Sequence, residues 1–472
     1  MSRFAVVLTV VLLIALAPAA LLAQGDSKGA ISTSQAKALR SSFAIDPETR
    51  AIMNAVANNK LREVALDQET MKVSDMFFSN KIETKGITDQ NSTGRCWLYA
   101  GLNVLRPAVI EKYGLSEFEF SENYLFFWDK LEKANLFLEA MIERRGRDVD
   151  DREVEWLFRH PCPDGGQWNM VVALVEKYGV VPMSAMPENE QSKDSGVWNA
   201  LLSRRLRKDA LELRAMHERG NSLRDLRARK MEMLEDVYRI LAITLGHPPT
   251  EFVWRYEDKD GNVSEPKRYT PREFYREVVG EDLGEYVYLI STPLEAYGRM
   301  YEITFDRDMY DRPNMTFANV RPEEMKGMAL SALLDGRPVW FGCDVGKEHY
   351  RDKGVGMMAT GVYRYDAVYG VEFSMTKEER LLTRDGVPSH AMVFTGVDVD
   401  GDRPIKWLVE NSWGTDYGDD GMWMLSDPWF DDYVYGVVVH RDYVTKRVAD
   451  ILGEKPTILP PWDPMFDAAM WR

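Results

Sequence analysis

Apolar positions in the first half of the chain recur with the three- and four-residue spacing of a helix. One such run follows Cys96, continues through Leu102, Leu105 and Val109, and closes near Gly114. Residues 46–75 show helical spacing with mixed charges, and the aromatic-rich residues 116–133 are expected to form core against the Cys96 helix. The first half is therefore predicted to be mainly helical.

Residues 196–245 also follow helical spacing, but they form the most basic part of the chain. Acidic residues such as Asp209, Glu212 and Asp225 are interleaved with the basic ones, so a solvated helix pair is favoured over a nucleic-acid-binding surface. Further on, the turn at residues 259–262 predicts a hairpin between residues 252–256 and 263–269.

From about residue 337 the pattern changes to short apolar runs of strand length. These runs cover residues 338–345, 391–397 and 407–414, and a turn at residues 400–402 joins the last two. A helical half followed by a sheet-rich half predicts an α+β fold with a cleft between two unlike halves.

The first 24 residues have the pattern of a secretory signal peptide. Arg3 is their only charge, residues 4–17 are apolar without a break, and Ala19, Ala20 and Ala23 are small residues suited to cleavage. This run is shorter than the ~20 residues that span a bilayer, and no other run is long enough. We therefore expect a periplasmic or extracellular protein without a stable membrane span; an uncleaved anchor is the alternative.

Composition narrows the class of protein. The chain has 472 residues, of which 45% are hydrophobic and 28% charged, so it is expected to be globular. The net charge of −16 disfavours a general nucleic-acid or anionic-membrane binder. The histidines lack a ligand spacing such as His-x3-His, and no phosphate-binding glycine loop is visible, so we expect neither metal nor cofactor.

Three cysteines, Cys96, Cys162 and Cys343, leave at least one thiol unpaired. A Cys162–Cys343 disulfide is compatible with export, but two buried free thiols is the favoured interpretation. Cys96 differs because it lies at a predicted helix start, next to the cationic Arg95. A helix N-terminus favours the nucleophilic thiolate, whereas an isolated cysteine is more often buried and inert.

Three other polar residues could provide the remaining groups that a cysteine nucleophile needs. His390 stands just before one predicted strand and Asn411 lies within the next, and adjacent strands bring such residues together. A histidine can exchange a proton with a thiol near neutral pH, and an amide oxygen can orient its ring. Gln90, six residues before Cys96, offers a side-chain N–H to an oxyanion.

These residues lie in runs that resemble the bleomycin hydrolase/aminopeptidase C group of papain-like cysteine peptidases. The similar runs extend from about residue 50 to 466 and include residues 92–98, 103–106, 164–168, 176–182, 340–345, 409–414 and 459–465. The resemblance implies a papain-like α+β fold with helical insertions. It also implies an aminopeptidase acting on peptide substrates with Cys96, His390 and Asn411 as catalytic residues and Gln90 in the oxyanion hole.

The resemblance further implies a homohexamer with internal active sites, and a substrate groove lined by Gly165 and Gly166. A C-terminal arm, with Trp462, Asp463 and Arg472, would lie in the cleft so that its terminal carboxylate meets the free amine of the substrate. Group members are mostly cytosolic, and their arms usually end in small residues, whereas this chain ends in the bulkier residues 466–472.

The expected order of segments is a signal peptide and leader, two catalytic halves separated by an insertion, and the arm. Their ranges are 1–24 (signal peptide), 25–45 (flexible leader), 46–195 (helical half with Cys96), 196–335 (helical or mixed insertion), 336–455 (sheet-rich half) and 456–472 (arm). An endopeptidase or dipeptidase-like trimming enzyme is the alternative function if the tail does not cap the cleft. A non-catalytic binding or scaffold protein is the third hypothesis.

Overall fold

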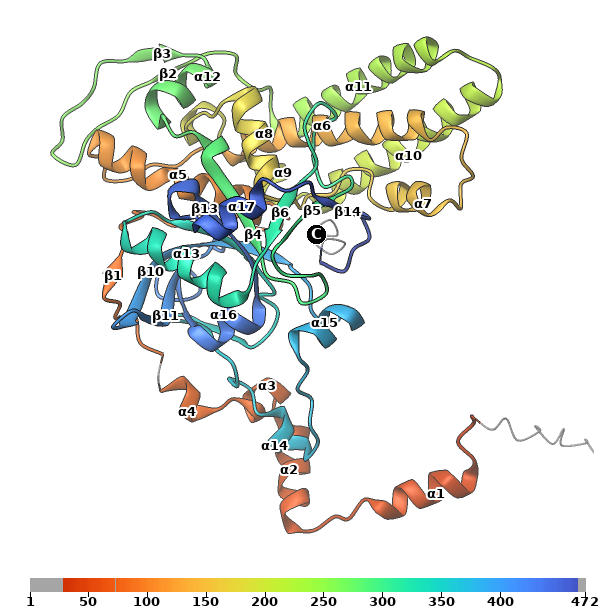
Figure 1. The fold of residues 1–472 in the computed structure, drawn as a ribbon, viewed down its shortest axis with the longest axis vertical. Coiled ribbons are helices and arrows are strands. Elements are labelled where there is room, and N and C mark those ends of the chain that lie inside the picture. Colours follow the sequence, from red (N-terminus) through yellow and green to blue (C-terminus); the bar gives the residue numbers. More distant parts are fainter. Residues whose placement is uncertain (1–28, 73, 466–472) are drawn as a thin grey trace, which may run out of the picture. The chain divides into compact units, whose positions relative to one another are not determined.

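The computed structural model describes residues 29–72 and 74–465 of the chain (Figure 1). The chain divides into two compact units, residues 1–65 and 66–472. Within the first unit lie helices α1 (Thr33–Ser42), α2 (Pro47–Asn58) and α3 (Leu61–Ala65). Helix α1 lies inside the stretch expected to be a flexible leader. A capping box between Ser32 and Gln35 satisfies the first backbone N–H groups of α1 and accounts for this local helix.

The helical part of the second unit is organised around α6 (Glu122–Glu143), which begins at the capping residue Ser121. Helices α8 (Trp168–Tyr178), α10 (Gly196–Glu218) and α11 (Leu223–Leu245) pack against α6. The aromatic residues of α6 are mostly buried, as expected. Short helices α7 (Arg152–Arg159), α9 (Glu190–Lys193) and α12 (Pro271–Phe274) complete this part, whereas α4 (Gln68–Met71) lies by the sheet, where Met71 packs with Met357 and Met424.

Helices α10 and α11 lie side by side, as Figure 1 shows. Apolar residues such as Leu206 and Leu241 are buried, and ion pairs such as Arg229–Glu212 and Arg205–Asp236 link the two helices. The predicted solvated helix pair is therefore confirmed. The predicted hairpin is confirmed too, with shorter strands β2 (Phe252–Trp254) and β3 (Lys267–Tyr269).

The described residues also form a twelve-stranded sheet, in which β1 (Asn80–Lys81) pairs with β10 beside the main path. The main path runs in the order β14 (Thr457–Leu459), β5 (Arg299–Ile303), β6 (Thr316–Asn319), β4 (Tyr286–Ile290), β13 (Val434–His440), β7 (Val339–Cys343), β10 (His390–Asp400), β11 (Arg403–Glu410), β12 (Met422–Ser426), β9 (Val355–Met358) and β8 (His349–Asp352).

Helices α13 (Pro322–Leu334) and α16 (Asp427–Tyr433) pack on this sheet, and α17 (Lys446–Leu452) contacts β5 and β6. Two further helices, α14 (Tyr365–Tyr369) and α15 (Lys377–Thr383), lie between β9 and β10 in the sequence. None of the helices in the described part of the chain combines the length and apolar character needed to cross a bilayer.

The sheet differs from the sequence prediction in two places. Strand β4 pairs with β13 and β6, so the segment 196–335, expected to be a helical or mixed insertion, also contributes strands to the central sheet. Strand β10 begins at His390 itself, and β11 ends at Glu410, so Asn411 follows its strand and does not lie within it. The burial of these strands on both faces obscured their ends in the sequence.

Helix α5 (Cys96–Tyr113) connects the helical part to the sheet, because it contacts both α8 and β10. It ends at Gly114, whose φ of 62° is left-handed, as the sequence predicted. Its approach to α8 is close, since a Cβ on Gly101 would lie 2.8 Å from the side chain of Val171. Cys96 is thus the first residue of a helix that is fixed on two sides.

Candidate active site

The structure brings five of the predicted site residues to one cavity between the helical part and the sheet. Its lining includes Gln90, Cys96, Gly165, Gly166 and His390. Asn411 lies behind His390, and its amide oxygen is 2.9 Å from His390 Nε2. Residues separated by up to about three hundred positions in the sequence therefore converge at one site.

Cys96 is half-buried in this cavity, at the positively polarised end of α5. Cys162 and Cys343 are buried and free, so the interpretation as free thiols is confirmed and no disulfide joins them. Burial raises the pKa of the Cys162 thiol to about 11 and also raises the pKa of Cys343. Among the three, Cys96 is therefore the thiol that a substrate can reach.

His390 is held by hydrogen bonding and by an aromatic neighbour. The Asn411 amide oxygen accepts from the Ser412 backbone N–H at 2.8 Å, which fixes the orientation of the amide. Because this oxygen can only accept, His390 Nε2 carries the hydrogen and Nδ1 is the basic nitrogen of the neutral ring. The Trp413 ring lies 4.8 Å from the imidazole, between centroids, and limits its rotation.

The Gln90 side chain is fixed by both ends of its amide. Its Nε2 donates to the Thr93 carbonyl at 2.7 Å, and its Oε1 accepts from the Ser412 hydroxyl at 2.8 Å. An amide nitrogen has two hydrogens, so one remains for a ligand in the cavity that Gln90 lines. Ser412 and Thr93 therefore support the site, although the sequence analysis assigned neither of them a role.

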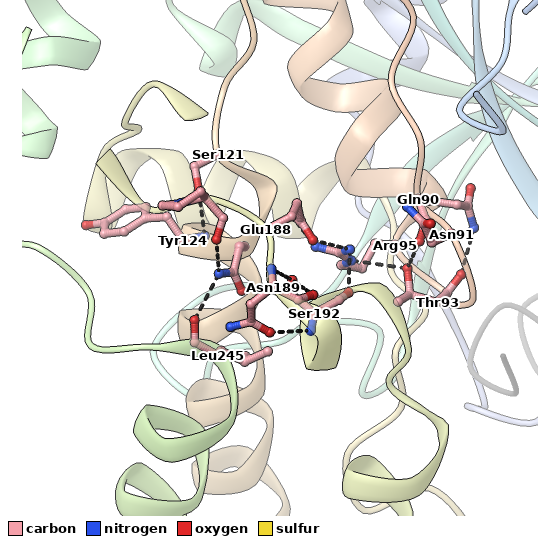
Figure 2. Close-up of polar contacts among 12 residues, drawn as sticks. Gln90, Asn91, Thr93, Arg95, Ser121, Tyr124, Glu188, Asn189, Ser192 and Leu245 are labelled. Carbon is pink, nitrogen blue, oxygen red and sulfur yellow. Dashed lines mark hydrogen bonds and ion pairs between the residues drawn. The ribbon is translucent and has the colours of Figure 1, made fainter. Parts of the chain in front are cut away.

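The Arg95 guanidinium pairs with a carboxylate of the helical part and does not line the cavity that Cys96 lines. The guanidinium is fully buried, makes two hydrogen bonds of 2.9 Å with Glu188, and donates to the Ser192 carbonyl at 2.6 Å (Figure 2). The ion pair holds the pKa of the Glu188 carboxyl below its usual value despite burial. Two aromatic rings, of Tyr99 and Phe126, also contact the guanidinium. Arg95 and Cys96 are adjacent in the sequence, but successive side chains at the start of a helix point in different directions, so the two side chains face different surroundings.

The glycine side of the cavity is held by buried lysines of α6. Lys133 Nζ donates to the Gly165 carbonyl at 2.7 Å, and Lys130 Nζ contacts Asp164 at 2.5 Å. A Cβ on Gly166 would lie 2.6 Å from the Trp97 ring, so this position requires glycine. Lysines spaced by three on a helix look like a solvated face in the sequence, which is why they were missed.

One buried ion pair links the two walls behind the site. Arg106 of α5 contacts Glu410, the last residue of β11, at 2.6 Å, and both side chains are at most 1% exposed. Arg106 also donates to the Gly86 carbonyl at 2.9 Å. Burial raises the pKa of the Glu410 carboxyl in spite of the nearby arginine.

The C-terminal segment reaches the same cavity. Strand β14 pairs in parallel with β5, and the chain then continues to Met465, which lines the cavity with Cys96. The Arg152 guanidinium lies 4.1 Å from the Trp462 ring centroid, and Arg384 donates to the Trp462 carbonyl. Asp463 is largely buried and accepts from the Met465 N–H. Arg472 lies outside the described residues, as does the predicted signal peptide.

Among the residues that the structure describes, no cluster of histidine, cysteine, aspartate or glutamate could hold a metal ion. A cysteine at a helix start, beside a histidine oriented by an amide, is the arrangement of a thiol-dependent hydrolase. The chain belongs to the Peptidase C1-like family, whose model matches residues 30–466. It is a cysteine peptidase with a papain-like fold.

The similarity extends over nearly the whole chain. Aminopeptidase C of Listeria monocytogenes is 39% identical over 90% of this chain and 96% of its own length. Bleomycin hydrolase of Homo sapiens is 36% identical over 93% of this chain and 99% of its own. The crystal structure of PepW from Lactobacillus rhamnosis superposes with a TM-score of 0.90 at 38% identity, covering 93% of this chain and 99% of that one.

Proposed function

We propose how this chain, a cysteine aminopeptidase by its family and relatives, cleaves the first peptide bond of a peptide. Cys96 is the nucleophile, His390 the general base and acid, Asn411 the residue that orients His390, and Gln90 an oxyanion donor. The observation that carries the proposal is the convergence of Cys96, His390 and Gln90 in one cavity, with Asn411 bonded to His390.

In the first half of the reaction, the Cys96 thiol gives its proton to His390 Nδ1, and the thiolate attacks the carbonyl carbon of the first residue. The carbonyl oxygen becomes an oxyanion between the second Gln90 Nε2 hydrogen and the Cys96 backbone N–H. His390 then protonates the leaving amine. In the second half, a water molecule gives a proton to His390 and attacks the thioester carbonyl. The C–S bond then breaks, the first residue leaves as a free amino acid, and His390 returns the proton to the Cys96 thiolate.

The test of the nucleophile is Cys96→Ala, with Cys162→Ser as a matched control for loss of a thiol elsewhere. We expect Cys96→Ala to abolish hydrolysis of fluorogenic aminoacyl substrates with an unchanged circular dichroism spectrum, while Cys162→Ser stays active. Full activity of Cys96→Ala would refute the assignment. Labelling of the native protein at Cys96 by an epoxide thiol inhibitor would argue against the scaffold hypothesis.

Cleavage at the N-terminus fits the position of the C-terminal arm. Met465 lines the cavity, and Trp462 is anchored by Arg152 and Arg384, so the arm occupies part of the cleft that a longer peptide would need. Gly165 and Gly166 would line the remaining groove. We expect peptides with a free amine to be cleaved and N-acetylated ones to resist. Efficient cleavage of acetylated peptides would favour the endopeptidase or trimming alternative.

Two further proposals concern assembly and location. The group resemblance supports a homohexamer, which light scattering coupled to size exclusion would measure as six times the mass of the mature chain. The pattern of residues 1–24 supports export, and mass spectrometry of the mature protein would then find an N-terminus near Ala23. The same spectrum would show whether the C-terminus still ends at Arg472.

A further inference from the structure

We infer that Thr93 is a positioning residue for the oxyanion contact, and that Arg95 acts through it. The inference rests on the proposed role of Gln90. Thr93 holds Gln90 through both of its polar groups: the Thr93 carbonyl accepts from Gln90 Nε2 at 2.7 Å, and the Thr93 hydroxyl donates to the Gln90 carbonyl at 2.6 Å. The two bonds close a ring between residues three apart.

Arg95 completes this ring from behind. Its Nε donates to the Thr93 hydroxyl oxygen at 3.1 Å. The Thr93 hydroxyl has one hydrogen, which it donates to the Gln90 carbonyl. A lone pair of the same oxygen therefore remains to accept the hydrogen bond from Arg95 Nε. The positive charge of Arg95 polarises the Thr93 hydroxyl and so strengthens the hydrogen bond that this hydroxyl donates to the Gln90 carbonyl, because successive hydrogen bonds in a chain strengthen one another.

The guanidinium is itself held from the helical part of the molecule, as Figure 2 shows. Its Glu188 partner precedes Asn189, whose side chain caps α9 and donates to the Thr244 carbonyl at the end of α11. The Ser192 carbonyl, which accepts from Arg95, belongs to the same short helix. Gln90 is thus tied through Thr93 and Arg95 to the segment around α9 and the end of α11, which do not line the cavity.

The primary test compares Thr93→Val with Thr93→Ser, and uses Ser92→Ala in the same turn as the matched control. Valine keeps the shape of the side chain but removes the hydroxyl, so we expect kcat for an aminoacyl amide to fall about 10-fold with KM nearly unchanged. Serine keeps the hydroxyl and should restore kcat to within about 2-fold. Ser92 is exposed, and Ser92→Ala should behave as the native enzyme.

Two readouts separate positioning from general damage. Alkylation of Cys96 by iodoacetamide forms no oxyanion, so its rate and pH profile should be the same in Thr93→Val as in the native enzyme. Gln90→Ala alone should lower kcat about 10²–10³-fold, and adding Thr93→Val to it should cause no further loss. Arg95→Met combined with Glu188→Met removes the guanidinium without leaving the Glu188 charge unpaired. The fall in kcat that this double substitution causes should also be absent when Gln90 is already alanine.

The possible failures are distinguishable. Full kcat in Thr93→Val, together with a large loss in Gln90→Ala, would overturn the inference and leave the proposed function standing. Multiplicative losses in the double variant, or a parallel fall in the alkylation rate, would also overturn it. Unchanged kcat in Gln90→Ala would remove the proposed oxyanion role of Gln90, and the inference with it, while Cys96→Ala would still test the nucleophile.

Discussion

The two walls of the cleft are built from different kinds of interaction. Beneath Cys96, buried ion pairs are concentrated on the helical wall: Arg95–Glu188, Lys130–Asp164 and Lys133–Asp129. Beneath His390, the sheet wall is aromatic and apolar, with stacked Phe341 and Phe394 beside Trp407 and Phe430. On that wall, His390 Nε2 bonds to the neutral amide of Asn411.

The difference follows from how each wall satisfies its backbone. Strands β10 and β11 bond to their neighbours along their length, so their backbone groups are satisfied within the sheet and that wall is filled mainly by apolar side chains. The helical wall presents loop segments at residues 89–95 and 162–167, whose carbonyls lack ladder partners. Lysine side chains donate to carbonyls of the second segment, for example at Cys162 and Gly165. Charge is buried where irregular backbone has to be fixed.

The largest expected effect comes from breaking a buried pair on the helical wall. Lys130→Met leaves the Asp164 carboxylate buried with only Ser195 and Gly94 as partners, and should lower the free energy of unfolding by about 3–5 kcal/mol at pH 7. Lys130 holds the pKa of Asp164 below its usual value. Without Lys130, burial raises the pKa of Asp164, so the deficit should shrink as the pH falls and Asp164 becomes protonated, first in the variant and then in the native protein. Urea unfolding at several pH values measures the difference in unfolding free energy between the variant and the native protein. A difference that does not change with pH would contradict the electrostatic cause.

A gain is expected at Asp306, which lies near Lys133 on the same wall. Burial raises the pKa of its carboxyl to about 7. The unfolded chain loses this proton near pH 4 and the folded chain only near pH 7, so stability falls as pH rises between these values. Asp306→Asn should remove this penalty and add about 4 kcal/mol above pH 7, with little change at pH 4. Thermal unfolding across this range measures the gain, and destabilisation at pH 8 would refute it.

The sheet wall should respond to lost packing and not to pH. Phe394 is fully buried, and its ring centroid lies 3.7 Å from that of Phe341. Phe394→Leu should cost about 2 kcal/mol through lost volume and stacking. The cost should be the same at pH 5 and pH 8, because no titratable group contributes to it. Urea unfolding measures the loss in unfolding free energy. A loss that depended strongly on pH would contradict the proposed difference between the helical wall and the sheet wall.

The smallest effect is expected from an exposed ion pair. Arg159 and Glu155 of α7 are 2.5 Å apart, but both side chains are more than half exposed. Arg159→Met should change the unfolding free energy by less than about 1 kcal/mol, since water screens such pairs. It is the matched control for Lys130→Met, because each replaces one cation of an ion pair with methionine. Equal losses in both variants would show that burial does not set the energy.

Much of this arrangement could be predicted from the sequence, because local patterns encode it. The helix start at Cys96, its end at Gly114 and the α10–α11 pair follow from spacing and capping. Cys96, His390 and Gln90 could be selected because their chemistry is complementary. Long-range pairings could not be predicted in this way. Three examples are the pairing of β4 with β13, the bond from Lys133 to the Gly165 carbonyl and the bond from Arg95 to Glu188. In each case the partner is distant in the sequence, and the local pattern of residues does not identify it.

The Arg106–Glu410 pair joins the helix that begins at Cys96 to the strand that ends beside Asn411. Any motion that parted the walls would have to separate two opposite charges from which water is excluded, at a cost of several kcal/mol. The pair therefore fixes α5 against the end of β11, and with them the spacing between Cys96 and Asn411.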